Sequence, residues 1–70
     1  MMSEHSYGIS EIVGSSTKST DDAIGNAIAK ASEDRRHIRW YQVIETRGHV
    51  ENGRIAHYQA VLKIGYTLEE

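Results

Sequence analysis

Residues 38–68 read IRWYQVIETRGHVENGRIAHYQAVLKIGYTL, two alternating segments joined by Asn52 and Gly53. Asn and Gly both tolerate positive φ, so this pair is the strongest short signal for a two-residue β-hairpin turn. We therefore predict two long antiparallel strands, Ile38 to Gly48 and Arg54 to Leu68. A two-residue turn predicts the pairs Glu51 with Arg54, Val50 with Ile55, Val43 with Leu62 and Trp40 with Gly65.

This pairing assigns the side chains of the hairpin to two faces of a sheet. The face expected to receive a helix carries Tyr41, Val43, Glu45, Tyr58, Ala60, Leu62, Ile64, Tyr66 and Leu68. Arg47 falls on the same face and would have to reach past the sheet end or toward another chain. The opposite face carries Trp40, Gln42, Ile44, Thr46, His57, Gln59, Val61, Lys63 and Gly65, and no second helix is available to cover it.

Gly65 opposite Trp40 leaves room for the indole to lie flat or for another planar group to stack on it. Two interpretations of Trp40 follow from the residues alone. It fills a subunit interface, where Trp is enriched, or it is a stacking platform for a planar ligand.

Upstream of the hairpin, Tyr7 to Val13 is predicted to form a strand that ends in a turn at Gly14-Ser15-Ser16. Ser19 stands three residues before Asp22, the arrangement in which a side chain caps a helix and the acid bonds back. The helix that follows has a narrow, mostly Ala apolar stripe: Ala23, Ile24, Ala27, Ile28 and Ala31. The predicted order of elements is β-α-β-β, an α+β fold.

Length and composition favour a single small domain over residues 1–70. The chain has 70 residues, no Cys and a formal net charge of −2. It therefore lacks disulfides, and general attraction for nucleic acid is disfavoured. No apolar run could cross a membrane, and Met1 to His5 does not resemble a signal peptide, so we expect a cytoplasmic protein. Ordering the chain costs conformational entropy on the order of 100 kcal/mol, and so short a chain has only a small apolar core to offset it. This favours oligomerisation.

Other candidate sites give weaker signals. His5, His37, His49 and His57 lack the spacing of metal ligands, so a metal site would have to be built between chains. No Gly-x-Ser-x-Gly nucleophile motif and no complete phosphate loop is present, which disfavours hydrolysis. The cluster of Arg35, Arg36 and Arg39 before Trp40 fits either a solvated helix end or contact with a phosphate or nucleic acid.

Several segments together resemble the bacterial dodecins: residues 13–16 (VGSS), 22–32, 40–43 (WYQV), 47–48 (RG), 56–59 (AHYQ) and 63–66 (KIGY). Their order and spacing cover nearly the whole chain. The resemblance implies a three-stranded antiparallel sheet wrapped on one helix. It also implies a hollow homododecamer that binds flavins, FMN or riboflavin, without being an enzyme.

The same resemblance implies roles for three residues of the site. Trp40 would stack on paired flavin rings and quench them, Gln59 would bond the pyrimidine edge, and Arg47 would lie near the flavin. Thr67 stands where bacterial members usually carry Arg or Lys, so binding of coenzyme A stays open. Arg39 could supply part of that charge, although strand alternation turns it away from Trp40. The roles of His57 and Lys63, in ligand contact or subunit contact, are also open.

Overall fold

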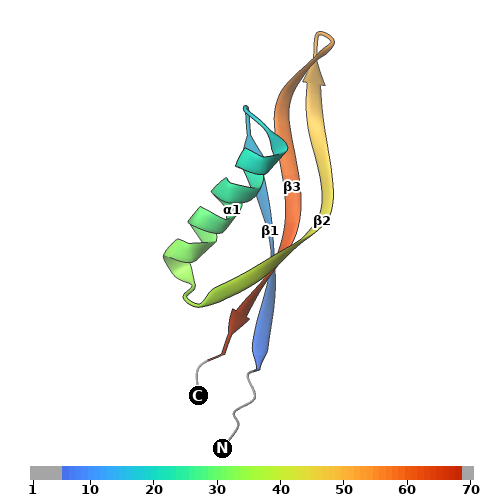
Figure 1. Ribbon diagram of the computed structural model, residues 1–70. Helices are drawn as coiled ribbons and strands as arrows, with labels where there is room; N and C mark the ends of the chain where they lie inside the picture. The colour runs from blue at the N-terminus through green and yellow to red at the C-terminus, as the bar shows by residue number, and fades with distance from the viewer. Residues whose placement is uncertain (1–5, 69–70) are drawn as a thin grey trace, which may run out of the picture.

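The computed structural model describes residues 6–68, which form three strands and one helix (Figure 1). The elements are β1 (Tyr7–Ser16), α1 (Thr20–Asp34), β2 (Ile38–Glu51) and β3 (Arg54–Thr67). Both strand pairs are antiparallel, and the sheet order β1-β3-β2 places β3 at the centre. The predicted β-α-β-β order and three-stranded antiparallel sheet with one helix are confirmed. In the described part of the chain, no helix is long and apolar enough to span a membrane.

The start of α1 is fixed by serine side chains, largely as predicted. Ser19 is the N-cap, and its hydroxyl accepts a hydrogen bond from the Asp22 N–H at 2.9 Å. The carboxylate of Asp22 accepts from the Ser16 hydroxyl at 2.7 Å. The predicted side-chain cap at Ser19 is therefore confirmed. The predicted return bond from the acid is wrong, because the Ser19 N–H donates to Ser16 Oγ at 3.4 Å and Asp22 bonds Ser16 instead. These bonds tie the first turn of the helix to the strand that precedes it.

Close contact between α1 and β1 depends on Gly14. A Cβ built on Gly14 would lie 2.0 Å from the Ala23 carbonyl oxygen and 2.7 Å from Ala27 Cβ. Ala23 and Ala27 are buried there together with Ala60 and Leu62 of β3. The predicted turn at Gly14-Ser15-Ser16 is wrong, because β1 continues through Ser16. The glycine serves helix packing, which a turn-like composition does not reveal.

The hairpin register agrees with prediction near both ends and differs between them. The turn has positive φ at Asn52 and Gly53, and the four predicted pairs all occur. Register shifts between Val43 and Glu45 and between His49 and Val50 move the intervening pairs by one residue. They pair Glu45 with Val61, Thr46 with Ala60 and Arg47 with Gln59.

These irregularities reverse the predicted faces of part of β2. Because opposed residues share a face, Glu45 and Arg47 lie with Val61 and Gln59, on the side away from α1. Thr46 lies with Ala60, on the helix side. The predicted placement of Glu45 and Arg47 on the helix face is therefore wrong, as is that of Thr46 on the opposite face. An extra residue in one strand inverts the alternation after it.

The side of the sheet away from α1 is here called the open face. Its residues come from all three strands: Tyr7, Ile9, Glu11, Val13 and Ser15 from β1, Trp40, Gln42, Glu45, Arg47 and His49 from β2, and His57, Gln59, Val61, Lys63 and Gly65 from β3. Ile9 and Val13 are more than half exposed. The open face thus combines apolar and polar side chains that no other part of the described chain covers.

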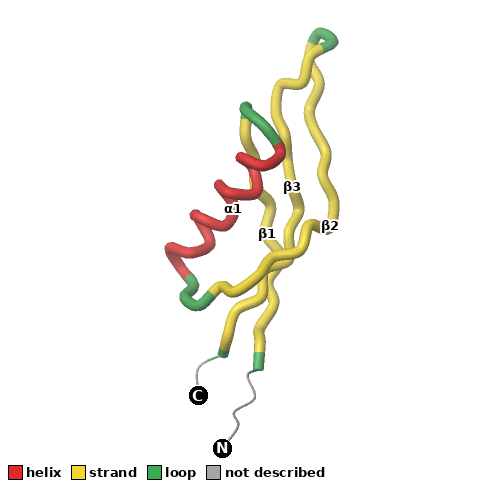
Figure 2. The backbone as a smooth tube through the Cα atoms, viewed as in Figure 1, coloured by secondary structure: helices red, strands yellow, loops and turns green. Residues whose placement is uncertain are grey.

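The helix covers only part of its own side. It packs against β1 and β3, and the β2–β3 hairpin extends well beyond it (Figure 2). Tyr41 and Val43 therefore remain 49% and 38% exposed, although they were predicted to receive the helix. The described residues measure 59 × 20 × 14 Å along their principal axes. An elongated shape with large exposed apolar side chains on both faces of the sheet is typical of a chain with interaction surfaces.

Candidate functional site

Trp40 lies on the open face, directly over Gly65. The two residues pair across β2 and β3, and a Cβ on Gly65 would lie 2.0 Å from Cε2 of the indole. The predicted room for a flat indole is therefore present, and the indole occupies it. Trp40 nevertheless remains 39% exposed. It presents an aromatic surface that a planar group can contact without displacing it.

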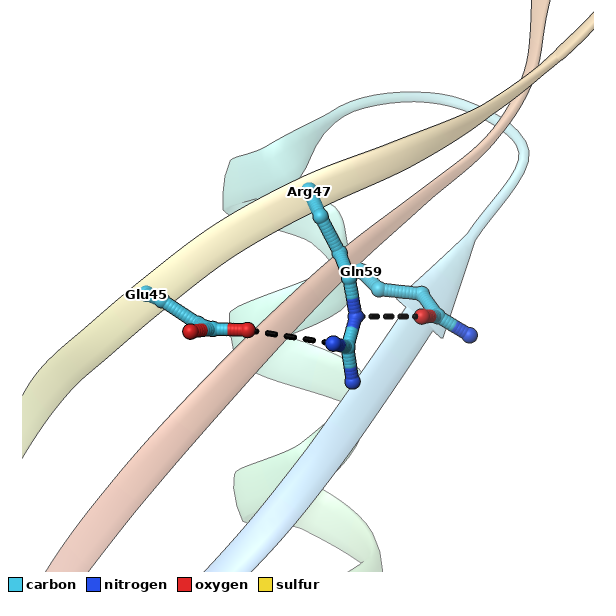
Figure 3. Close-up of polar contacts among 3 residues, drawn as sticks. All are labelled: Glu45, Arg47 and Gln59. Atoms are coloured by element: carbon cyan, nitrogen blue, oxygen red, sulfur yellow. Dashed lines mark hydrogen bonds and ion pairs between the residues drawn. The ribbon is translucent and has the colours of Figure 1, made fainter.

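Arg47 connects Gln59 with Glu45 on the same face, as Figure 3 shows. Its Nε donates to Gln59 Oε1 at 3.1 Å, and its Nη1 donates to Glu45 Oε2 at 3.1 Å. A guanidinium has only donors, so it fixes the Gln59 amide with the oxygen toward Arg47. The amide NH₂ then points away from Arg47 and is available to a ligand carbonyl (Figure 3).

Glu45 is the residue of this group that sequence reasoning missed. A signal was present, because Glu45 and Arg47 are two residues apart in a strand and such residues share a face. The charges pair at 3.1 Å while both side chains remain more than half exposed. An exposed pair contributes at most about 1 kcal/mol to stability, so its effect here is mainly on the direction of the Arg47 side chain.

Within one subunit, Trp40 is far from Gln59 and Arg47. Gly65, the partner of Trp40, lies six residues after Gln59 in β3, which is about 20 Å along a strand. The structure brings Arg47 and Gln59 together and leaves Trp40 at the other end of the open face. Lys63 and Gln42 lie between these two ends.

Two of the three clustered arginines contact the end of β3. The Arg35 guanidinium carbon lies 4.0 Å from the centre of the Tyr66 ring, a cation–π contact. Arg39 Nε donates to Thr67 Oγ1 at 3.2 Å. A register shift between Ile38 and Trp40 disturbs the alternation that was expected to turn Arg39 away from Trp40. The Arg39 guanidinium consequently reaches Thr67, which is two residues beyond Gly65.

The structure describes three of the four histidines, His37, His49 and His57. Within residues 6–68, no group of three or more His, Cys, Asp or Glu side chains is close enough to hold a metal ion. His49 and His57 face each other across the hairpin on the open face. His37 connects α1 to β2 with a φ of 65°. His5 lies outside the described residues.

The architecture and the open face define a small β-α-β-β protein with a single helix and an exposed aromatic and polar sheet face. Comparison with known families gives a more specific assignment. The family description "Dodecin" matches residues 7–69. The chain belongs to the dodecin family.

Individual relatives agree with this assignment. The dodecin of Thermus thermophilus is 40% identical over 60 residues, which cover 86% of this chain and 87% of that protein. The structure of dodecin from Streptomyces coelicolor is 43% identical, with a TM-score of 0.93 and 99% of each chain covered. That of dodecin from Streptomyces davaonensis is 41% identical, with a TM-score of 0.93, covering 97% of this chain and all of that one.

Proposed function

We propose that this protein binds a flavin, FMN or riboflavin, in a homododecamer, and that it stores and buffers the flavin without catalysing a reaction. The observation that carries the proposal is the exposed Trp40 indole, held over Gly65 on a sheet face that its own helix leaves open. Membership of the dodecin family supports the same function.

Stacking would supply most of the binding energy. Contact between an aromatic side chain and a nucleic-acid base, a comparable planar heterocycle, is worth about 1–3 kcal/mol. An indole in contact with an excited flavin can also donate an electron to it and quench its fluorescence. Rings held in pairs between tryptophans have little access to a second substrate, which favours storage and photoprotection over turnover.

Gln59 and Arg47 would recognise the polar edge of the flavin. The Gln59 NH₂ can donate to a ring carbonyl, while the second lone pair of Oε1 can accept from the ring N–H. Arg47 holds the amide in the orientation this requires. In this proposal Arg47 is a positioning residue for Gln59, and it adds positive charge near the carbonyl oxygens of the ring.

The distance between these residues means that the site needs more than one subunit. About 20 Å of strand separates Gln59 from the position opposite Trp40, more than one flavin ring system can span. One flavin can therefore contact Trp40 and Gln59 only when they come from different subunits. The exposed apolar residues of the open face, including Ile9 and Val13, favour such an assembly.

Preference for FMN over riboflavin, and binding of coenzyme A, depend on cationic groups at the rim of the site. Thr67 provides no charge where relatives usually carry Arg or Lys, but Arg39 lies beside it. A cytoplasmic location and the absence of nucleic-acid binding remain predictions that accompany this proposal. Binding of a nucleic acid or coenzyme by Arg35, Arg36 and Arg39 is the alternative function. It is less favoured, because Arg35 and Arg39 already contact β3.

The proposal is tested by titrating FMN and riboflavin with apo-protein while flavin fluorescence and native mass are recorded. Saturable quenching by a dodecamer is expected. Trp40→Ala should abolish the quenching and weaken binding at least about tenfold, and Trp40→Phe should retain part of the affinity. A Gly25→Ala variant is the matched control, because a Cβ there meets nothing within 4 Å.

Different outcomes overturn different parts of the proposal. A dodecamer that leaves flavin fluorescence unchanged contradicts flavin binding but not assembly. If such a dodecamer binds RNA and salt weakens that binding, the alternative role of Arg35, Arg36 and Arg39 as a nucleic-acid site would be favoured. Turnover of bound flavin with an electron donor would contradict the storage role.

A further inference from the structure

His49 and His57 form a pair that the proposed flavin site does not use. They are directly opposed in β2 and β3, two pairs closer to the turn than Arg47 and Gln59. Their ring centroids are 6.2 Å apart and the rings are tilted by 49°. Both side chains are exposed on the open face. Two imidazoles therefore lie side by side across the hairpin.

We propose that His49 and His57 chelate a divalent transition-metal ion of the zinc class. Directly opposed residues have Cβ atoms about 4.5–5.5 Å apart, so both rings can reach one ion at about 2.0–2.1 Å by rotating their side chains alone. The pair supplies two nitrogen ligands, and water or a neighbouring subunit completes the coordination. Imidazole nitrogen suits Zn²⁺, Cu²⁺ and Ni²⁺, whereas Mg²⁺ prefers oxygen ligands.

Glu51 strengthens this site from outside the coordination sphere. Its Oε2 lies 3.4 Å from His49 Nε2. In metal-binding histidines, the N–H of the second ring nitrogen commonly donates a hydrogen bond to a carboxylate, which fixes the tautomer and orients the ring. The other nitrogen of His49, Nδ1, is then free for the metal. A carboxylate at this position disfavours an anion as the ligand of the pair.

Calorimetric titration of the full-length, untagged protein with Zn²⁺ tests the proposal. We expect one Zn²⁺ per subunit and no uptake of Mg²⁺. His49→Gln and His57→Gln should each abolish measurable Zn²⁺ binding, and Glu51→Gln should weaken it about tenfold. Acidic pH should weaken it as well, since protons compete for the imidazole nitrogens.

His37→Asn is the matched control. The substitution removes a histidine outside the pair. The new asparagine tolerates the positive φ of 65° at this position. It should bind Zn²⁺ like the unchanged protein, and circular dichroism should show every variant folded. The proposal is overturned if the unchanged protein takes up no Zn²⁺, or if a folded His49→Gln/His57→Gln double variant binds it equally well.

Discussion

Small residues have different roles on the two faces of the sheet. On the helix side, Gly14, Ala23 and Ala27 allow α1 to approach β1 so closely that no added carbon fits. On the open face, a missing side chain at Gly65 makes room for the largest side chain in the protein, that of Trp40. At the contact between α1 and β1, small residues leave room for the helix alone. On the other side, one small residue supports an aromatic surface that remains available to a partner.

This contrast separates stability from binding. Changes at the helix–sheet contact are expected to affect folding, while changes on the open face are expected to affect ligand affinity in a folded protein. Each of the following variants tests that separation, beginning with the largest expected effect.

Gly14→Val should destabilise the subunit most. Its Cβ would meet the Ala23 carbonyl oxygen at 2.0 Å, a backbone atom that cannot move without shifting α1. The expected loss is about 3 kcal/mol in the free energy of unfolding, measured by chemical denaturation. A variant that loses less than about 1 kcal/mol would show that α1 is free to move off the sheet.

Gly65→Ala should weaken flavin binding while the protein stays folded. The new methyl group would occupy the space of the indole and displace it from the sheet. We expect about a tenfold loss of flavin affinity by fluorescence titration, together with a changed Trp emission spectrum. Unchanged emission and affinity would mean that the position of Trp40 over Gly65 does not matter for binding.

Arg47→Lys should have a smaller effect on the same measurement. Lysine keeps the charge but cannot donate to Gln59 and Glu45 from one planar group. Loss of the bond that orients Gln59 should cost about 1 kcal/mol, or about fivefold in flavin affinity. An Arg47→Lys affinity equal to that of the unchanged protein would remove Arg47 as a positioning residue.

Gly25→Ala should have the smallest effect and the opposite sign. Gly25 lies inside α1 with open space where its Cβ would be. The substitution should stabilise the protein by about 0.5–1 kcal/mol, because alanine has the higher helix propensity. A decrease in thermal stability would indicate that another chain packs against this part of the helix.

Local signals in the sequence were sufficient for the element order and the hairpin ends. Asn52 and Gly53 determine the turn, Ser19 caps the helix, and the pairs on both sides of the register shifts follow from a two-residue turn. The register shifts between β2 and β3 could not be predicted from the sequence, because an extra residue in a strand requires no particular side chain. Arg47 and Glu45 were therefore placed on the wrong face.

Tertiary packing accounts for the other differences. The stretch from Gly14 to Ser16 has the composition of a turn, and only contact with α1 shows why glycine is needed inside a strand. The exposure of Tyr41 and Val43 depends on which strands the helix covers, which strand alternation does not specify. Trp40 and Gln59 were both placed on the open face by alternation, but their distance depends on their positions along β3.

The central claim is that one flavin is held by Trp40 of one subunit and Gln59 of another. It is tested most directly by refolding Trp40→Ala and Gln59→Ala subunits together and titrating the mixed assembly with FMN. Random mixing should restore tight, quenched binding in about one quarter of the sites, although each variant alone lacks it. Mixed assemblies of native mass that recover no tight binding would contradict the claim.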